Sequence, residues 1–271
     1  MGTSVIIASG KGGTGKSFVT SGLGITLARL GQRVCIVDAD IGLRDQDLLL
    51  GVENNVVYDL LDITEKHCDY TRVLIPVPEH DRLTLLPAAQ FARVGDMDRE
   101  AFRRLIRELK RTHDFVLIDC PAGIERGLRN TLSEIVDDAL IVCTPDDVCI
   151  RNAERAAALI EKKLGLRPRL IVNRLDEELI RAGEMYSALT VAQTLDLPLF
   201  GEIPEDAMVR RAALNHLNPA DIMCDSRSAL VRVAGRLTGA NEPLPGIGTG
   251  KRSFLQKLLH RKPKEVITIN D

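Results

Sequence analysis

A glycine-rich segment near the N-terminus limits the folds that this chain can adopt. Residues 10–17 are Gly-Lys-Gly-Gly-Thr-Gly-Lys-Ser, which is the G-x-x-x-x-G-K-[ST] pattern of loops that hold nucleotide phosphates. An apolar run, residues 4–9, precedes it, and the apolar positions of residues 17–30 have helical spacing. A strand, a glycine loop and a helix in this order surround an anion with backbone N–H groups and a positive helix end. The segment predicts a phosphate site, because a simple turn has no need of Lys16 and Ser17.

The rest of the chain predicts an α/β protein. Continuous apolar runs alternate with helical segments, which indicates a mostly parallel sheet with helices on both faces. We expect strands at 34–37, 83–86, 115–118, 140–143, 170–172 and 199–203, and helices at 99–111, 151–164, 191–195 and 226–237. Residues 1–238 should form one domain. Residues 239–250 contain four glycines and two prolines, which is typical of a flexible linker, and residues 251–271 form a tail.

Composition narrows the setting in which such a domain acts. The chain has 271 residues, of which 45% are hydrophobic and 27% charged, as in ordinary globular proteins. Its six cysteines form no Cys-x-x-Cys pair, so we expect reduced thiols and a cytoplasmic protein. No signal peptide is apparent, and no apolar run approaches the roughly 18 residues of a spanning helix. A net charge of −2 argues against nucleic-acid binding by overall charge.

Polar residues that follow the expected strands form a candidate site. Ligands of open α/β sheets bind at the carboxyl ends of the strands. Asp40 follows the second strand, and Asp119 follows the run 115–118. With the Ser17 hydroxyl, these carboxylates can hold Mg²⁺ and position an attacking water.

Three residues after later strands are candidates for contact with a nucleobase. Asn173 follows 170–172, and Pro204 and Asp206 follow 199–203. An asparagine amide can bind an adenine edge, because it both donates and accepts hydrogen bonds. A turn asparagine, or a helix that begins with proline, explains the same residues nearly as well, so both interpretations stay open.

Together these segments resemble the deviant Walker A ATPases of the MinD/ParA group. The group's loop, K-G-G-x-G-K-[ST], matches residues 11–17, and residues 38–44 and 119–125 resemble the D-x-D-I-G-L-R and D-x-P-A-G-I-E blocks of its MinD branch. Members of that branch position the bacterial division septum. The resemblance covers nearly the whole chain, including the tail. Phe18, Asp45 and Asn152 depart from the branch's usual Thr, Asn and Asp, which leaves the details of partner binding open.

The resemblance implies slow ATP hydrolysis with Mg²⁺ as cofactor, activated by a partner and the membrane. It implies that Lys11 crosses a homodimer interface to the partner's phosphates, and that Asp40 orients or activates the attacking water. Lys16 and Ser17 would serve the phosphates and Mg²⁺. The other loop residues would bind nucleotide alongside them: Gly10, Gly12, Gly13, Thr14 and Gly15. The implied partners are a MinC-like inhibitor and a MinE-like or other topological regulator.

The tail predicts a membrane-binding helix. Residues 251–264 contain six basic residues and no acidic one. Helical spacing would place Phe254, Leu255, Leu258 and Leu259 on one stripe, with a basic opposite face that includes Lys251, Arg252, Lys257 and Arg261. Such a helix suits an anionic membrane surface. Burying the four apolar side chains yields roughly 6–12 kcal/mol, against an ordering cost on the order of 10–15 kcal/mol.

One tail is therefore a marginal anchor, whereas two tails on one dimer bind far more tightly. We expect ATP-dependent attachment to anionic lipids on the cytoplasmic face of the cell membrane. A tail helix packed on the core, or a disordered basic tail that contacts DNA non-specifically, remains an alternative. So do three other functions: a flagellar-number ATPase of the FlhG type, a ParA-type DNA partitioning ATPase, and a nucleotide-binding scaffold without turnover.

Overall fold

One mixed sheet forms the centre of the molecule. The computed structural model describes residues 1–65, 67–90, 97–122, 132–215 and 217–249. Within them, eight strands pair in the order β3-β4-β2-β5-β1-β6-β7-β8. All neighbours are parallel except β3 and β4, which pair antiparallel. The strands are β1 (Thr3–Ala8), β2 (Val34–Asp38), β3 (Ile75–Pro76), β4 (Leu83–Leu86), β5 (Phe115–Asp119), β6 (Asp138–Cys143), β7 (Arg169–Leu175) and β8 (Leu199–Pro204).

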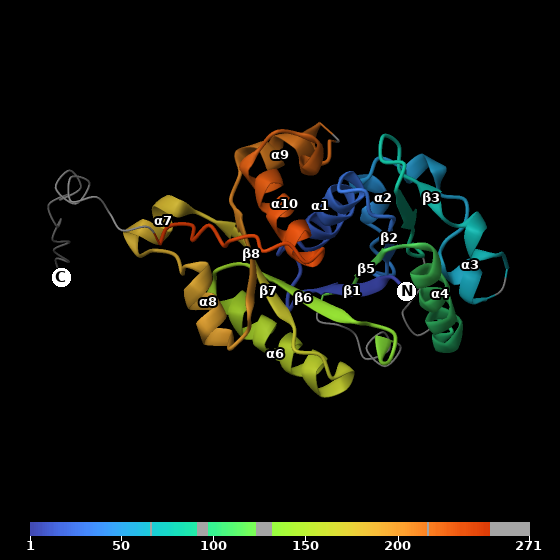
Figure 1. Cartoon of the computed structure of the whole chain (residues 1–271), viewed down its shortest axis with the longest axis horizontal. Helices are drawn as coiled ribbons and strands as arrows, with labels where there is room; N and C mark the ends of the chain where they lie inside the picture. Colours follow the sequence, from blue (N-terminus) through green and yellow to red (C-terminus); the bar gives the residue numbers. More distant parts are fainter. Residues whose placement is uncertain (66, 91–96, 123–131, 216, 250–271) are drawn as a thin grey trace, which may run out of the picture.

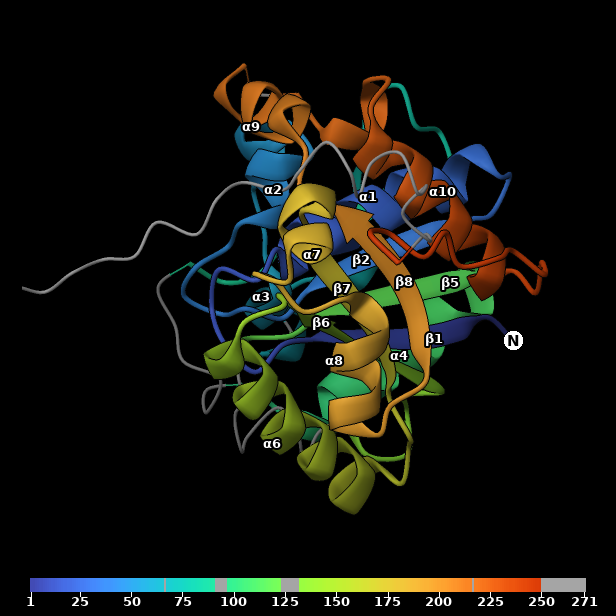
Figure 2. The same ribbon diagram turned by 90° about the vertical axis from the view of Figure 1, so that its left-hand side faces the viewer.

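Helices cover both faces of this sheet (Figure 1). The α-helices are α1 (Lys16–Arg29), α2 (Gln46–Leu49), α3 (Leu60–Thr64), α4 (Arg99–Thr112), α6 (Asp147–Leu164), α7 (Glu177–Ala182), α8 (Ala188–Leu195), α9 (Ala207–Leu214) and α10 (Asp225–Leu237). Three short 3₁₀ turns are η1 (Glu53–Asn55), η2 (Tyr70–Arg72) and η4 (Pro219–Asp221). Figure 2 shows α6 and α8 on one side of the strands and α1 and α10 on the other.

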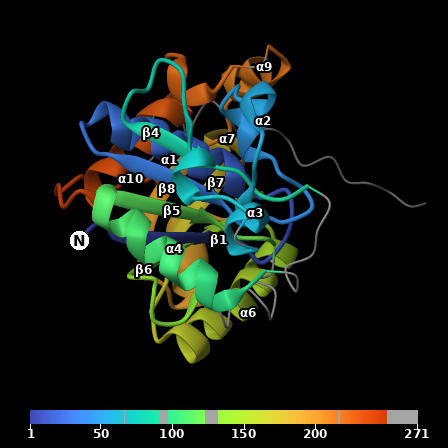
Figure 3. The same ribbon diagram turned by 90° about the vertical axis from the view of Figure 1, so that its right-hand side faces the viewer.

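Alternating strand residues build two apolar layers. In β1, Ile6 and Ala8 belong to the layer that contains residues of α4, α6 and α8. Val5 and Ile7 belong to the opposite layer, with residues of α1 and α10. Figure 3, a view from the right-hand side of Figure 1, shows α4 next to β5 and β1. The strands are apolar at consecutive positions because both of their faces are buried.

The predicted fold class, a mostly parallel sheet with helices on both faces, is confirmed. The expected strands and helices are present, with ends that differ by at most four residues. The sequence did not predict β3, α2, α3, α7 or α9, which are all eight residues or shorter. All six cysteines are free thiols, and no described helix is long and apolar enough to cross a membrane.

The segment after α10 lies against the domain over its described part, 239–249. Arg236 in α10 donates to the carbonyl oxygens of Glu242 (2.8 Å) and Pro243 (2.6 Å). The Gly246 N–H donates to the carboxylate of Glu202 in β8 at 2.7 Å. The flexibility of this segment and the domain limits remain predictions. All the residues expected to touch a membrane lie in 251–271, outside the described residues.

Candidate functional site

The glycine loop joins the end of β1 to the start of α1, as the sequence predicted. Gly13 and Gly15 have φ angles of 81° and 88°, in the region that favours glycine. A Cβ atom on Gly10 would lie 2.1 Å from the carbonyl carbon of Asn152, so the loop can approach α6 only with glycine there. Gly15 is the N-cap of α1, and the unpaired N–H groups at this helix end lie at the loop, where an anion would bind.

Lys16 lies at the centre of a buried group of carboxylates. Its Nζ is 2.7 Å from Asp119 Oδ1 and 3.6 Å from Asp40 Oδ2. Only 7% of Lys16 and 1% of Asp119 are exposed. Burial alone would lower the pKa of Lys16, but the Asp119 carboxylate outweighs it and the pKa is raised. The ammonium group is therefore charged, and its charge offsets the cost of burying the carboxylates of Asp119 and Asp40.

Two acidic residues of the site, Asp38 and Asp40, have raised pKa values. Burial raises the pKa of Asp40, with Lys16 opposing that shift. Burial, followed by the charge of Asp119, raises the pKa of Asp38 to about 8. Asp38 also accepts hydrogen bonds from the backbone N–H groups of Asp40 (3.0 Å) and Gln46 (3.2 Å). Perturbed carboxylates of this kind gather at functional sites.

Two residues that the sequence did not single out hold Asp119. The Thr20 hydroxyl donates to Asp119 Oδ1 at 3.1 Å, and the Gln46 amide donates to Asp119 Oδ2 at 2.7 Å. They are 99 and 73 residues away from Asp119 along the chain. Thr20 lies one helical turn after Lys16, and this spacing was the only feature of the sequence that could have indicated its place in the site. Nothing in the sequence pattern distinguished Gln46.

The expected magnesium residues come together on one side of Lys16. The Lys16 ammonium lies 3.4 Å from the Ser17 hydroxyl and contacts Asp40 and Asp119. A hydroxyl and two carboxylates form an all-oxygen donor set, which fits Mg²⁺. In the described part of the chain, no group of three or more His, Cys, Asp or Glu side chains is placed to hold a metal ion by itself.

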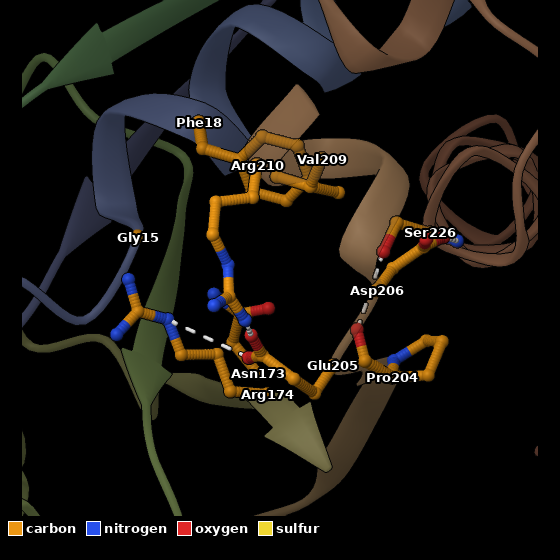
Figure 4. A pocket seen from close by; sticks show the side chains of 10 residues that line it. All are labelled: Gly15, Phe18, Asn173, Arg174, Pro204, Glu205, Asp206, Val209, Arg210 and Ser226. Carbon is orange, nitrogen blue, oxygen red and sulfur yellow. Dashed lines mark hydrogen bonds and ion pairs between the residues drawn. The ribbon is translucent and has the colours of Figure 1, made fainter. Parts of the chain in front are cut away.

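A pocket of about 240 Å³ lies beside the glycine loop. Figure 4 shows its lining, which includes Asn173, Pro204 and Asp206 as predicted. The rest of the lining is Gly15, Phe18, Arg174, Glu205, Val209, Arg210 and Ser226. The Glu205 carboxylate pairs with Arg210 at 3.3 Å and lies 4.0 Å from Arg174. The mouth of the pocket is thus charged, and its position next to Gly15 suits the base of a nucleotide whose phosphates lie on the loop.

Two of the predicted base residues have structural partners in this pocket. Asn173 lies in an irregular stretch of β7 between Val172 and Leu175, and its amide donates to the Thr14 carbonyl oxygen at 2.8 Å. Asp206 accepts from the N–H groups of Met208 (2.8 Å) and Ser226 (3.1 Å). Asn173 therefore fixes the glycine loop, and Asp206 fixes two helix starts. Contact of either residue with a base stays a prediction.

Lys11 lies apart from this centre. It is exposed and makes no ion pair with any described residue. With Gly12, Gly13 and Thr14 it lines a second hollow of about 410 Å³, whose lining also includes Thr144, Pro145 and Asp146. Exposed apolar Leu179 borders the same hollow. Lys11 is thus an exposed cation at a partly apolar surface.

Comparison with known proteins identifies the family. Residues 1–220 match the ParA family, described as NUBPL iron-transfer P-loop NTPase. The chain is 37% identical to the septum site-determining protein MinD of Bacillus subtilis over 262 residues, which are 95% of this chain and 97% of the relative. The chain belongs to the MinD family of P-loop NTPases. It is thereby an ATPase of the group that its sequence resembles.

Solved structures agree with this MinD assignment. The MinC:MinD cell division protein complex of Aquifex aeolicus matches with a TM-score of 0.81 and 34% identity, covering 89% of this chain and 98% of that chain. MinD of Pyrococcus horikoshii complexed with Mg-ADP matches with a TM-score of 0.76 and 26% identity, covering 88% and 97%. This chain is therefore similar in fold to these MinD proteins across almost their whole length.

Proposed function

We propose that this chain is an ATPase that dimerises when it binds ATP, attaches to the cytoplasmic face of the membrane, and positions the division septum. Its partners would be a MinC-like inhibitor and a MinE-like or other topological regulator. The septum role is supported by the MinD relatives, and the inhibitor by the MinC:MinD complex. One observation carries the chemistry, namely the buried Lys16 held between Asp119 and Asp40 at the end of a glycine loop.

In the proposed reaction, Lys16 exchanges partners. Its ammonium group pairs with Asp119, and it would turn to the β- and γ-phosphates of bound ATP. Ser17 and Asp119 would then hold the Mg²⁺ ion, which supplies charge neutralisation at the transferring phosphoryl group. Asp40, whose raised pKa brings it nearer to the range of a base, would orient the attacking water.

Dimerisation would depend on Lys11. Its exposed position on the second hollow leaves the ammonium free to reach the phosphates of a second chain. A cation supplied in trans stabilises the charge of the transferring phosphoryl group, as an arginine finger does. ATP presents a γ-phosphate to such a lysine and ADP does not, so the dimer would form with ATP alone.

The test is co-sedimentation with vesicles that contain an anionic lipid. We expect the full chain to pellet with Mg-ATP and to stay in the supernatant with Mg-ADP. Lys11→Ala should abolish pelleting because no dimer forms, whereas Lys162→Ala, which removes an exposed lysine of α6, should not. Deletion of residues 251–271 should abolish pelleting without loss of nucleotide binding. Equal pelleting with both nucleotides would refute the proposal.

Two further assays separate the alternatives. A ParA-type partitioner would co-sediment with DNA in the presence of ATP, and the present proposal expects no such binding. Phosphate release in the presence of vesicles and a partner distinguishes an ATPase from a scaffold. We expect Asp40→Ala to abolish that release while nucleotide binding persists, and persistent release would refute the assigned role of Asp40.

A further inference from the structure

Gln46, the first residue of α2, connects the acidic centre to the segment that follows β2. Its side chain is completely buried. The amide nitrogen donates to Asp119 Oδ2 at 2.7 Å and to the Ser17 carbonyl oxygen at 3.1 Å. Its backbone N–H donates to Asp38 at 3.2 Å. One residue therefore contacts the last residue of β2, the last residue of β5 and the start of α1.

Chemistry fixes the orientation of the Gln46 amide. Both of its near neighbours, a carboxylate and a backbone carbonyl, are acceptors, so the NH₂ group must face them and the oxygen must face away. The Gln46 side-chain oxygen is buried and has no hydrogen-bond donor among the described residues. A buried acceptor without a donor is unfavourable, and a helix start packed in a core has no need of such an amide. The contact with Asp119 gives the amide a purpose.

The three groups that donate hydrogen bonds to Asp119 would respond differently to a bound nucleotide. Lys16 and Thr20 donate to Oδ1, and among the residues that the structure describes only Gln46 donates to Oδ2. If Lys16 turns to the phosphates, Asp119 loses the one cationic partner that it has in the described part of the chain. Thr20 and Gln46 are then the groups that keep the carboxylate in place, because neither has a reason to leave.

We infer that Gln46 is a positioning residue for magnesium-dependent nucleotide binding. It holds Asp119 in the orientation that receives the Mg²⁺ ion after Lys16 has moved to the phosphates. Its unpaired oxygen offers an acceptor to a donor that enters with the nucleotide. The inference rests on the proposed magnesium–nucleotide site, and it assigns to Gln46 no contact with the reacting atoms.

The test compares Gln46→Leu with a variant that alters a contact at the other end of α2 and does not touch Asp119. Asn218→Ala is a suitable control, because Asn218 donates to the Leu49 carbonyl oxygen at 3.1 Å and ties down the other end of α2. Two quantities are measured with the full chain and ADP: the Mg²⁺ concentration for half-maximal binding of a fluorescent ADP analogue, and the rise in melting temperature between ADP with EDTA and Mg-ADP. Gln46→Met serves as a second variant if Gln46→Leu does not fold.

We expect Gln46→Leu to weaken Mg²⁺ binding about 10- to 100-fold, the range found for partners of metal ligands. It should lose most of the magnesium-dependent rise in melting temperature, while binding of ADP without metal stays unchanged. Asn218→Ala should keep the full rise. An unchanged rise in the Gln46 variants, or an equal loss in Asn218→Ala, would overturn the inference and leave the proposed function intact. Absence of the rise in the wild-type protein would overturn both.

Discussion

The stability of the protein without added nucleotide should depend strongly on Lys16. Lys16→Met keeps much of the side-chain volume and removes the cation that neutralises Asp119. The pair is buried, with exposures of 7% and 1%, and breaking a buried pair from one side costs about 3–5 kcal/mol. At about 2–4 °C per kcal/mol for a domain of this size, the melting temperature should fall by roughly 6–20 °C. A purely phosphate-binding lysine at the surface would produce almost no change without nucleotide.

Urea unfolding of the nucleotide-free protein measures this effect directly. Lys11→Met is the matched control from the same loop, and it should stay within about 0.5 kcal/mol of the wild type because Lys11 is exposed. The double variant Lys16→Met/Asp119→Asn should recover much of the loss, since the nearer and more deeply buried of the two carboxylates beside Lys16 is then a neutral amide. A loss below about 1 kcal/mol in Lys16→Met, or no recovery in the double variant, would refute the claim that the buried Lys16–Asp119 pair stabilises the fold.

Three other predictions follow from the same geometry. Gly10→Ala should destabilise the fold and abolish nucleotide binding, because its Cβ would lie 2.1 Å from backbone of Asn152; calorimetry with ADP measures this, and normal affinity would contradict it. Asn173→Ala should cost about 1–3 kcal/mol in urea unfolding, since the buried Thr14 carbonyl loses its donor; no change would show that the contact is dispensable. The pKa of Asp38 is raised from 3.8 to about 8, so between these pH values the folded state holds a proton that the unfolded state releases. The free energy of unfolding should therefore fall as pH rises from about 4 to 8. Asp38→Asn should flatten that slope, and an unaltered slope would contradict the pKa shift.

The sequence predicted the sheet well because the physics of buried parallel strands is local. A strand covered on both faces is apolar at consecutive positions, and the run 83–86 could be placed without error for that reason. The glycine loop could be predicted equally well. Its φ angles and its close approach to α6 both require glycine, and the glycines are visible in the sequence. Asp40 and Asp119 could be placed near the loop because the carboxyl ends of parallel strands lie at one edge of the sheet.

The remaining features depend on contacts between distant segments, which periodicity does not encode. Gln46 meets Asp119 across 73 residues, and its neighbours in the sequence give no sign of that contact. The sequence left open whether Asn173 contacts a base or has a structural role, and it gave no sign that its amide donates to the Thr14 carbonyl oxygen from an irregular stretch of β7. Short elements such as β3, with two residues, are too brief to produce a pattern.

Light scattering of the Asp40→Ala variant tests the central claim most directly, because a hydrolysis-impaired protein keeps ATP bound while its mass is measured. The account predicts a molar mass of about twice 29.8 kDa with Mg-ATP, and the monomer mass with Mg-ADP. Adding Lys11→Ala to Asp40→Ala should restore the monomer in ATP without loss of nucleotide. The same mass with both nucleotides, or a dimer that persists without Lys11, would contradict the claim that ATP joins two chains through this lysine.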